Sequence, residues 1–144
     1  MFRGNHAATV DAKGRLKVPT AFHRKLMEDG EPRVFLTSLD GECACIFPMS
    51  VWKEIEDRHR NALDPKSRKF RRYVNAYGDE RHLDAQGRVL FPRPLRAKAR
   101  LVGKVDVLGQ GRYLEAWNGD LLRARLEADR PSDEELTDLA AGGS

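Results

Sequence analysis

The sequence predicts a mainly β fold with short helices, in which two similar halves share one hydrophobic core around a pseudo-two-fold axis. Three observations support this prediction. A nine-residue pattern occurs twice, 73 residues apart. Each copy alternates apolar and polar residues around tight turns, as short strands do. Finally, a copy of about 45 residues is too small to be stable alone, whereas two copies together have the size of one ordinary domain.

The repeated pattern predicts a tight turn in each copy. Residues 11–19 read D-A-K-G-R-L-K-V-P and residues 84–92 read D-A-Q-G-R-V-L-F-P, so five of nine positions are identical. The first Asp can accept backbone N–H groups of the turn, and the Gly three residues later supplies the positive φ that closes it. We therefore expect Gly14, Asp84 and Gly87 to be structural turn residues.

The remaining elements of the two copies follow in the same order. Short strands over residues 7–10 and 81–83 precede the turns. The outgoing strand of the first copy has Leu16 and Val18 facing inward and Arg15 and Lys17 facing outward. Short helices then begin at Pro19 and Pro92, in the first helical position, and end near Gly30 and Gly103. Second hairpins pair residues 34–37 with 43–47 and residues 105–108 with 113–117.

A helical insert separates the copies. We expect Ser50 to cap a helix that extends as far as Leu63, and Asp64 to cap a second helix with Pro65 in its first position. After the second copy, we expect Asn118 to cap a helix that carries Leu121, Leu122 and Leu126. The chain beyond Pro131 is polar and is expected to fray.

These elements divide the chain into four parts. The first copy spans residues 5–51, the insert 52–76, the second copy 77–120, and a C-terminal helix with an acidic tail 121–144.

The charge distribution favours a polyanionic partner. The net charge is +4, but the residues from Glu127 onward hold six acids and one base, so residues 1–126 carry +9. A compact body this basic is typical of nucleic-acid-binding proteins, although a soluble protein with a high pI explains it equally well. No stretch has the roughly 20 apolar residues of a membrane helix, and the N-terminus lacks an apolar signal core. We therefore expect a cytoplasmic protein without membrane contact.

The residues give little support for an enzyme, a metal site or a cofactor. The four histidines have no metal-ligand or triad-like spacing, and there is no phosphate loop or nucleophile elbow. Cys43 and Cys45 lack a second cysteine pair, so packing on one face of a strand is favoured over zinc binding. The basic run 66–72 is favoured as the solvated face of a helix. The same interpretation applies to Arg96 and its basic neighbours after the second turn.

The two turn arginines, Arg15 and Arg88, have two interpretations. Each can form an ion pair with an Asp, either Asp11 or Asp84, in its own turn or in the other one. Alternatively, two equivalent turns related by a pseudo-two-fold axis present both arginines to a duplex, where arginine binds phosphate or guanine bidentately. The residues alone leave both interpretations open.

Together these features resemble the bacterial MraZ family. The likeness rests on the opening Met1-Phe2-Arg3-Gly4, the paired D-x-x-G-R turns followed by an apolar residue, any residue and Pro, and the helical insert. It extends from Met1 to about Leu126. The two copies look like AbrB-type (SpoVT-AbrB) swapped-hairpin half-domains in tandem, which implies one pseudo-two-fold β-barrel.

The resemblance implies a nucleoid-associated DNA-binding regulator of transcription. Such proteins bind short direct repeats of double-stranded DNA in the promoter ahead of the division and cell-wall gene cluster, as ring homo-oligomers of about eight subunits. Carried over by position, the DNA-contacting residues are Arg3, Asp11, Lys13, Arg15 and Arg88. We expect the first turn to be the stronger reader, because the second has Gln86 and Leu90 where the first has lysines. The alternatives are an antitoxin-like protein-interaction module, in which the arginines hold the fold together, and an enzyme on a related barrel.

Overall fold

A computed structural model describes residues 1–28 and 32–142 of the chain. Within these residues short strands alternate with short helices. The strands are β1 (Asn5–Val10), β2 (Arg15–Lys17), β3 (Arg33–Thr37), β4 (Ala44–Pro48), β5 (Asp79–His82), β6 (Arg88–Leu90), β7 (Gly103–Gly109) and β8 (Leu114–Asn118). The helices are α1 (Thr20–Glu28), α2 (Met49–His59), α3 (Pro65–Tyr77), α4 (Arg93–Lys98), α5 (Gly119–Ala128) and α6 (Asp133–Ala140).

The strands form one antiparallel sheet in which the two copies exchange strands. Its order is β5-β3-β4-β8-β7-β1-β2-β6. The first strand of each copy pairs with the third strand of the other, β1 with β7 and β5 with β3. Equivalent strands pair with each other across the axis, β2 with β6 and β4 with β8. The predicted swapped-hairpin arrangement with a pseudo-two-fold axis is therefore confirmed.

The sheet curls into a nearly closed barrel that holds the main core. Its end strands, β5 and β6, contact each other. On the other side of β5, Leu83 N–H just after this strand donates to Pro32 O, just before β3, at 2.7 Å. Apolar residues of both copies fill the interior, including Leu16 and Val89 at equivalent positions of β2 and β6. The interior is therefore a joint product of the two copies, as predicted.

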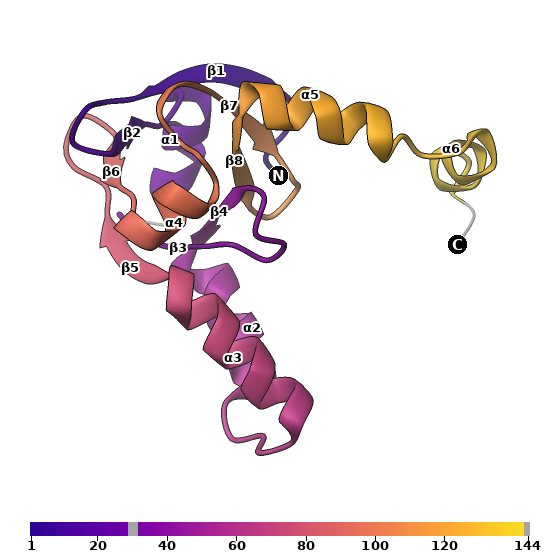
Figure 1. Cartoon of the computed structure of the whole chain (residues 1–144), viewed down its shortest axis with the longest axis horizontal. Coiled ribbons are helices and arrows are strands. Elements are labelled where there is room, and N and C mark those ends of the chain that lie inside the picture. Colours follow the sequence, from indigo (N-terminus) through magenta and orange to yellow (C-terminus); the bar gives the residue numbers. More distant parts are fainter. Residues whose placement is uncertain (29–31, 143–144) are drawn as a thin grey trace.

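A second apolar cluster lies where the insert packs on the outside of the barrel. The α2–α3 hairpin projects from the body on the side of β3 and β4 (Figure 1). Trp52 of α2 stacks on Phe35 of β3, with ring centroids 4.3 Å apart. Val74 of α3 is buried in the same cluster, as its helical spacing with Phe70 and Tyr77 predicts.

The insert follows the predicted order with two corrections at its first helix. Helix α2 begins at Met49 with Pro48 as its N-cap, so Ser50 is not the cap. The helix ends at His59, which leaves Leu63 outside it and 82 % exposed, because an apolar residue beyond the last turn has no helical face to join. The predicted start of the second helix of the insert, α3, is confirmed: Asp64 accepts a hydrogen bond from Ser67 N–H at 3.0 Å, and Pro65 is the first helical residue.

The short helices after the turns begin and end differently from the prediction. Helix α1 begins at Thr20, and α4 has Pro92 as its N-cap, so each proline precedes the first helical position. The left-handed residue that ends α4 is Arg100, with φ 54°. Gly103 also has a positive φ, 66°, but it lies beyond the end of the helix, at the start of β7. Leu101 N–H donates to Arg96 O and Arg100 N–H to Ala97 O, which is the Schellman pattern that ends many helices. Gly30 lies outside the described residues.

The C-terminal region forms more helix than predicted. Asn118 caps α5 through Asp120 N–H and Leu121 N–H, as expected, but Leu126 is 60 % exposed because α5 leaves the body before reaching it. The polar tail does not fray after Pro131. Ser132 and Glu135 form a capping box that starts α6, and this exposed helix stands away from the barrel (Figure 1).

None of the helices in the described part of the chain combines the length and the apolar character needed to cross a bilayer.

Candidate nucleic-acid interface

The first turn is organised by the side chain of Asp11. Its Oδ1 accepts the backbone N–H groups of Lys13 at 2.9 Å and Arg15 at 3.0 Å. The backbone closes the turn as well, because Gly14 N–H donates to Asp11 O at 2.9 Å. Gly14 has φ 90°, a conformation that L-residues with a side chain rarely adopt. The spacing of Asp and Gly therefore fixes the path of the chain, as predicted.

The second turn repeats these contacts at the equivalent positions. Asp84 Oδ1 accepts from Gln86 N–H and from Arg88 N–H, both at 2.9 Å. Gly87 has φ 78°, and its N–H donates to Asp84 O at 3.0 Å. Two turns with one geometry therefore arise from the two copies of the pattern.

Each turn arginine forms an ion pair with the aspartate of its own turn. Arg15 Nε donates to Asp11 Oδ2 and Arg88 Nε donates to Asp84 Oδ2, both at 2.8 Å. Among the described residues, no acceptor bonds to the terminal nitrogens of either guanidinium, and both side chains are about one-third exposed. The ion pair thus uses the nitrogen nearest the backbone and leaves the outer edge of each guanidinium available to a ligand.

The same hydrogen bonds depress the pKa of both aspartates. Backbone donation from Arg15 and the ion pair with its side chain lower the pKa of Asp11 below its ordinary value. For Asp84, backbone donation from Arg88 is the main cause, and the pKa falls to about 2. Both carboxylates are therefore ionised at neutral pH and hold their arginines in place.

Acidification is expected to weaken the second turn. The folded-state pKa of Asp84 is about 2, below its ordinary value of 3.8. The ionised carboxylate therefore contributes stability that is complete above 3.8 and is lost as pH falls toward about 2. Melting temperatures of the parent and of Asp84→Asn between neutral pH and pH 2 test this, and the variant should lose less stability in acid. Parallel profiles for the two proteins would contradict it.

The two turns lie next to each other because β2 and β6 pair antiparallel across the pseudo-two-fold axis. Arg15 is opposite Leu90, and Lys17 is opposite Arg88. Val18 N–H donates to Gly87 O at 2.9 Å, and the equivalent Phe91 N–H donates to Gly14 O at 3.1 Å.

We call this two-stranded segment, with its turns over residues 11–17 and 84–90, the turn ribbon. Leu16 and Val89 are buried beneath it, so the alternating residues Arg15, Lys17 and Arg88 share its outer face. Arg15 and Arg88 are diagonal neighbours on this face, and the backbone positions of such neighbours in an antiparallel pair are about 7–8 Å apart.

Each turn is also covered by a residue of the other copy that sequence reasoning did not select. A Cβ added to Gly14 would collide with the Arg96 guanidinium, and one added to Gly87 would lie 2.9 Å from His23 Nδ1. His23 and Arg96 are equivalent positions, 73 residues apart. Extending the repeat alignment into the helices would have paired them, although it would not have shown that each covers the opposite turn.

The two turns differ in charge. Lys13, Arg15 and Arg96 lie at the first turn, with Leu90 of β6 opposite Arg15. Gln86, Arg88 and His23 lie at the second turn, with Lys17 of β2 opposite Arg88. The antiparallel register thus brings Lys17 beside the second turn, so the first turn keeps more positive charge, but by a smaller difference than the sequence pattern indicated.

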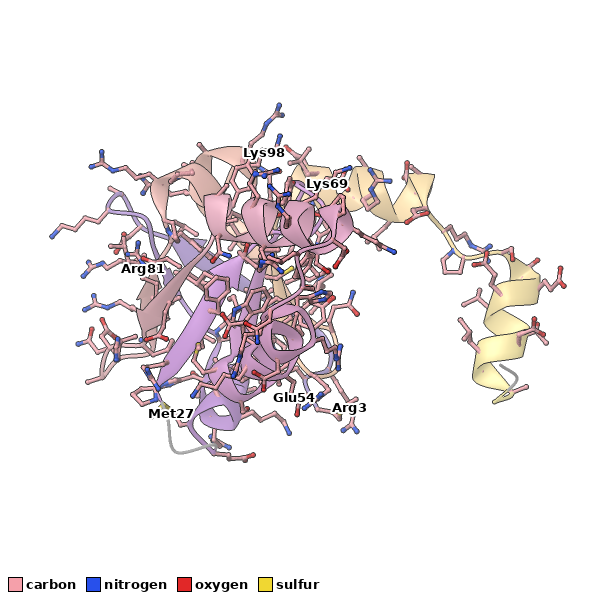
Figure 2. All side chains as sticks on the ribbon, turned by 90° about the horizontal axis from the view of Figure 1, so that it is seen from below. Arg3, Met27, Glu54, Lys69, Arg81 and Lys98 are labelled. Carbon is pink, nitrogen blue, oxygen red and sulfur yellow. The ribbon has the colours of Figure 1, made fainter. Side chains whose placement is uncertain are left out.

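Arg3 does not lie at the turn ribbon. It is beside Gly109 at the opposite end of β1 from Asp11, and Phe2 pairs with Gly111 there. Arg3 and Arg81, which is close to the second turn, lie on opposite sides of the body (Figure 2). The family resemblance groups Arg3 with Lys13 among the DNA-contacting residues, which implies that the two lie close together. The structure contradicts this closeness, because the six residues of extended strand β1 separate them.

The basic run of α3 is partly structural and partly solvated. Arg71 donates from Nη1 to His59 O at 2.5 Å and from Nη2 to Ala62 O at 2.6 Å, which ties α3 to the end of α2. The other basic residues of the run, Lys66, Arg68, Lys69 and Arg72, are exposed.

Comparison with known proteins gives the same two-part division of the chain. A family model described as "MraZ protein, putative antitoxin-like" matches residues 1–73 and 76–135, and each match contains one of the two turns. The chain belongs to the MraZ family. The resemblance indicated by the paired turns is thereby confirmed, together with the tandem organisation.

Curated relatives in the MraZ family match nearly the whole chain. A protein of Acidobacterium capsulatum named transcriptional regulator MraZ is 40 % identical over 145 residues, which is 99 % of both chains. Proteins with the same name from Aromatoleum aromaticum and a Marinomonas species are 38 % and 35 % identical. They cover 89 % and 96 % of this chain, and the matches span 88 % and 93 % of the relatives. Family membership therefore supports a role in regulating transcription and not in catalysis.

Proposed function

We propose that this chain is a sequence-specific, DNA-binding repressor that contacts duplex DNA through the turn ribbon. The observation that carries the proposal is the pair of arginines, Arg15 and Arg88, which share one exposed face with their outer guanidinium edges unbonded among the described residues. A two-stranded β ribbon fits the major groove, where arginine binds guanine O6 and N7 bidentately. Lys13 at the first turn and Lys17, which is opposite Arg88, add positive charge for phosphates.

In this proposal the first turn contributes more to DNA recognition than the second turn does. It has more positive charge, and Asp11 fixes the orientation of Arg15 before DNA arrives, which lowers the entropic cost of binding. The second turn contributes mainly through Arg88. Arg3 belongs to another part of the surface and contributes little to the ribbon contact.

Assembly would supply the affinity that one ribbon lacks. A single subunit engages few phosphates, so a ring homo-oligomer of about eight subunits on successive direct repeats would gain through effective concentration. Subunits on one face of the duplex imply repeats about 10 bp apart. In this proposal the repeats lie in the promoter of a division and cell-wall gene cluster, and the protein is cytoplasmic and nucleoid-associated.

A titration of the purified chain with DNA tests this function. The probe is a labelled duplex from the region upstream of the chain's own gene, and the control is a shuffled duplex of the same composition, at two salt concentrations. We expect tight binding to the upstream duplex, weaker binding to the control, and loss of affinity for both as salt rises. Equal binding to both duplexes would contradict sequence-specific recognition.

Removal of the acidic tail is expected to strengthen DNA binding. Truncation after Pro131 removes four acids and no base, which raises the net charge from +4 to +8. Because the electrostatic field of the whole protein acts on a polyanion, the affinity for DNA should rise about tenfold at low salt. The gain should be smaller at high salt, where ions screen the charges. DNA titrations of the truncated chain measure this. An unchanged affinity at low salt would show that the tail lies too far from the DNA to matter.

A further inference from the structure

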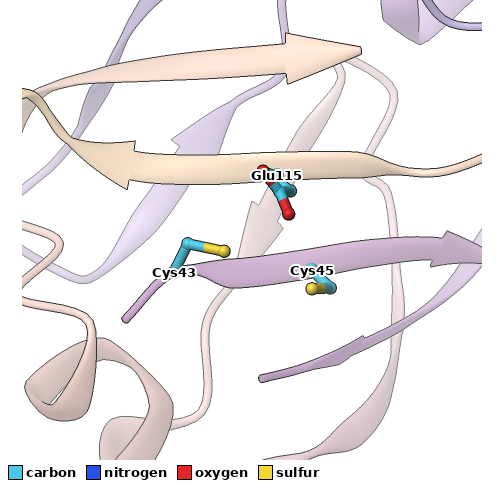
Figure 3. Close-up of side chains that lie close together, drawn as sticks. All are labelled: Cys43, Cys45 and Glu115. Atoms are coloured by element: carbon cyan, nitrogen blue, oxygen red, sulfur yellow. The ribbon is translucent and has the colours of Figure 1, made fainter. Parts of the chain in front are cut away.

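Two cysteines and a glutamate converge on the outer face of the barrel. Cys43 immediately precedes β4 and Cys45 lies in it, two residues apart and both 1 % exposed. Glu115 of β8 lies opposite Cys45 in the strand register. Figure 3 shows the Glu115 side chain extending from β8 toward β4, the strand that carries Cys45, with Cys43 just before that strand. This cluster lies outside the turn ribbon and has no part in the proposed DNA contact.

The donor atoms of this cluster are close enough for a small cation. The two Sγ atoms and one carboxylate oxygen of Glu115 all lie within 4.8 Å of one another. In a tetrahedral zinc site with bonds of about 2.3 Å to sulfur and about 2.0–2.2 Å to oxygen, neighbouring ligand atoms are about 3.3–3.8 Å apart. Binding of a cation would therefore shorten the separations between these atoms by at most about 1.0–1.5 Å, which small side-chain rotations supply.

Glu115 carries a negative charge that the protein itself leaves without a cationic partner. Its Oε1 accepts a hydrogen bond from Trp117 Nε1 at 3.0 Å, which fixes the orientation of the carboxylate. Within residues 1–28 and 32–142, no lysine or arginine forms an ion pair with it, although it is half-buried beside an apolar cluster. A partly buried carboxylate without a cation is costly, and a bound cation would offset this cost.

The lack of a second cysteine pair in the sequence favours packing over zinc binding for the two cysteines. The structure adds a ligand that spacing could not show, since Glu115 is 70 residues further along the chain. A second oxygen is also near, because Asp40 Oδ1 lies 3.9 Å from Cys43 Sγ.

We propose that Cys43, Cys45 and Glu115 bind a divalent cation of the zinc type, with a water molecule as the fourth ligand. On binding, each thiol releases its proton to solvent, and the cation forms two bonds to sulfur and one to oxygen. The site would join β4 to β8, which is one of the two strand pairs that cross the pseudo-two-fold axis. The cation would thus act as a staple between the two copies.

Cobalt binding to the reduced full-length chain without an affinity tag tests the proposal. Co²⁺ occupies zinc sites and shows thiolate charge-transfer absorption when cysteine binds it. We expect one Co²⁺ per chain with this absorption, displacement by Zn²⁺, and a higher melting temperature with Zn²⁺. Glu115→Gln keeps an acceptor for the Trp117 indole, and it should weaken Co²⁺ binding at least tenfold. Glu54→Gln, which removes an exposed carboxylate paired with Arg112, should leave binding unchanged.

Cys45→Ser should reduce the charge-transfer absorption, and the double variant Cys43→Ser/Cys45→Ser should abolish it. Absence of this absorption in the reduced, folded parent would overturn the proposal. So would a Zn²⁺-dependent rise in melting temperature that is equally large in the parent and the double variant, because the cation would then bind elsewhere.

Discussion

Arg15→Ala is expected to abolish measurable binding to the upstream duplex. Loss of one bidentate arginine interaction costs about 1–3 kcal/mol. This loss recurs in every subunit that engages the same duplex, so it multiplies across an oligomer. Arg88→Ala should weaken binding less, because fewer cations surround the second turn. Gel shifts of the three proteins on one duplex give the order of affinity directly.

The fold and the proposed oligomer should survive Arg15→Ala. The Arg15–Asp11 ion pair is only partly buried, and ion pairs accessible to solvent contribute little to stability. The melting temperature and the sedimentation profile are therefore expected to match those of the parent. If both instead changed while DNA binding fell in proportion, the arginine would be a structural residue, as the interaction-module hypothesis requires. Arg68→Ala, on the exposed face of α3, is the matched control and should bind DNA like the parent.

Leu16→Ala is expected to produce the largest loss of stability, about 2–5 kcal/mol. Leu16 is fully buried in β2, directly opposite Val89 of β6, so its removal leaves a cavity at the junction of the two copies. Because this junction also positions the turn ribbon, DNA binding should fall with stability. Chemical denaturation of the variant measures the free-energy change.

Leu63→Ala is the matched control for this cavity. Leu63 is 82 % exposed, so the same deletion of side-chain atoms should change the free energy of unfolding by less than about 0.5 kcal/mol. Similar losses in the two variants would contradict a core shared by the two copies at β2 and β6.

The repeat made most of the fold predictable. The Asp, Gly and Arg of each turn have local roles, so their spacing alone predicts the hydrogen bonds that the structure shows for Asp11 and Gly14. The shared core also followed, because two small units without their own core must combine, whereas the swapped pairing of the strands was implied by the family resemblance. The end of α4 was less predictable, since Arg100 adopts the left-handed conformation that glycine usually provides.

The contacts that the sequence could not predict are those that join distant segments. Arg96 covers the first turn and His23 the second, and neither contact has a local signal. Glu115 joins the two cysteines only because β4 pairs with β8 in one particular register. The predicted position of Arg3 was wrong for a related reason. Arg3 is near Asp11 in the sequence, but the extended strand β1 between them holds them far apart in space.

The salt dependence of DNA affinity tests the central claim most directly, namely that the turn ribbon is the surface that faces DNA. Two double variants remove the same charge from different places: Lys13→Ala/Lys17→Ala on the ribbon and Arg68→Ala/Lys69→Ala on α3. For the ribbon variant, the slope of log affinity against log salt should become shallower by about 0.9 for each phosphate that is no longer neutralised. The α3 variant should keep the slope of the parent. Equal slopes for the ribbon variant and the parent, or a change confined to the α3 variant, would contradict the account.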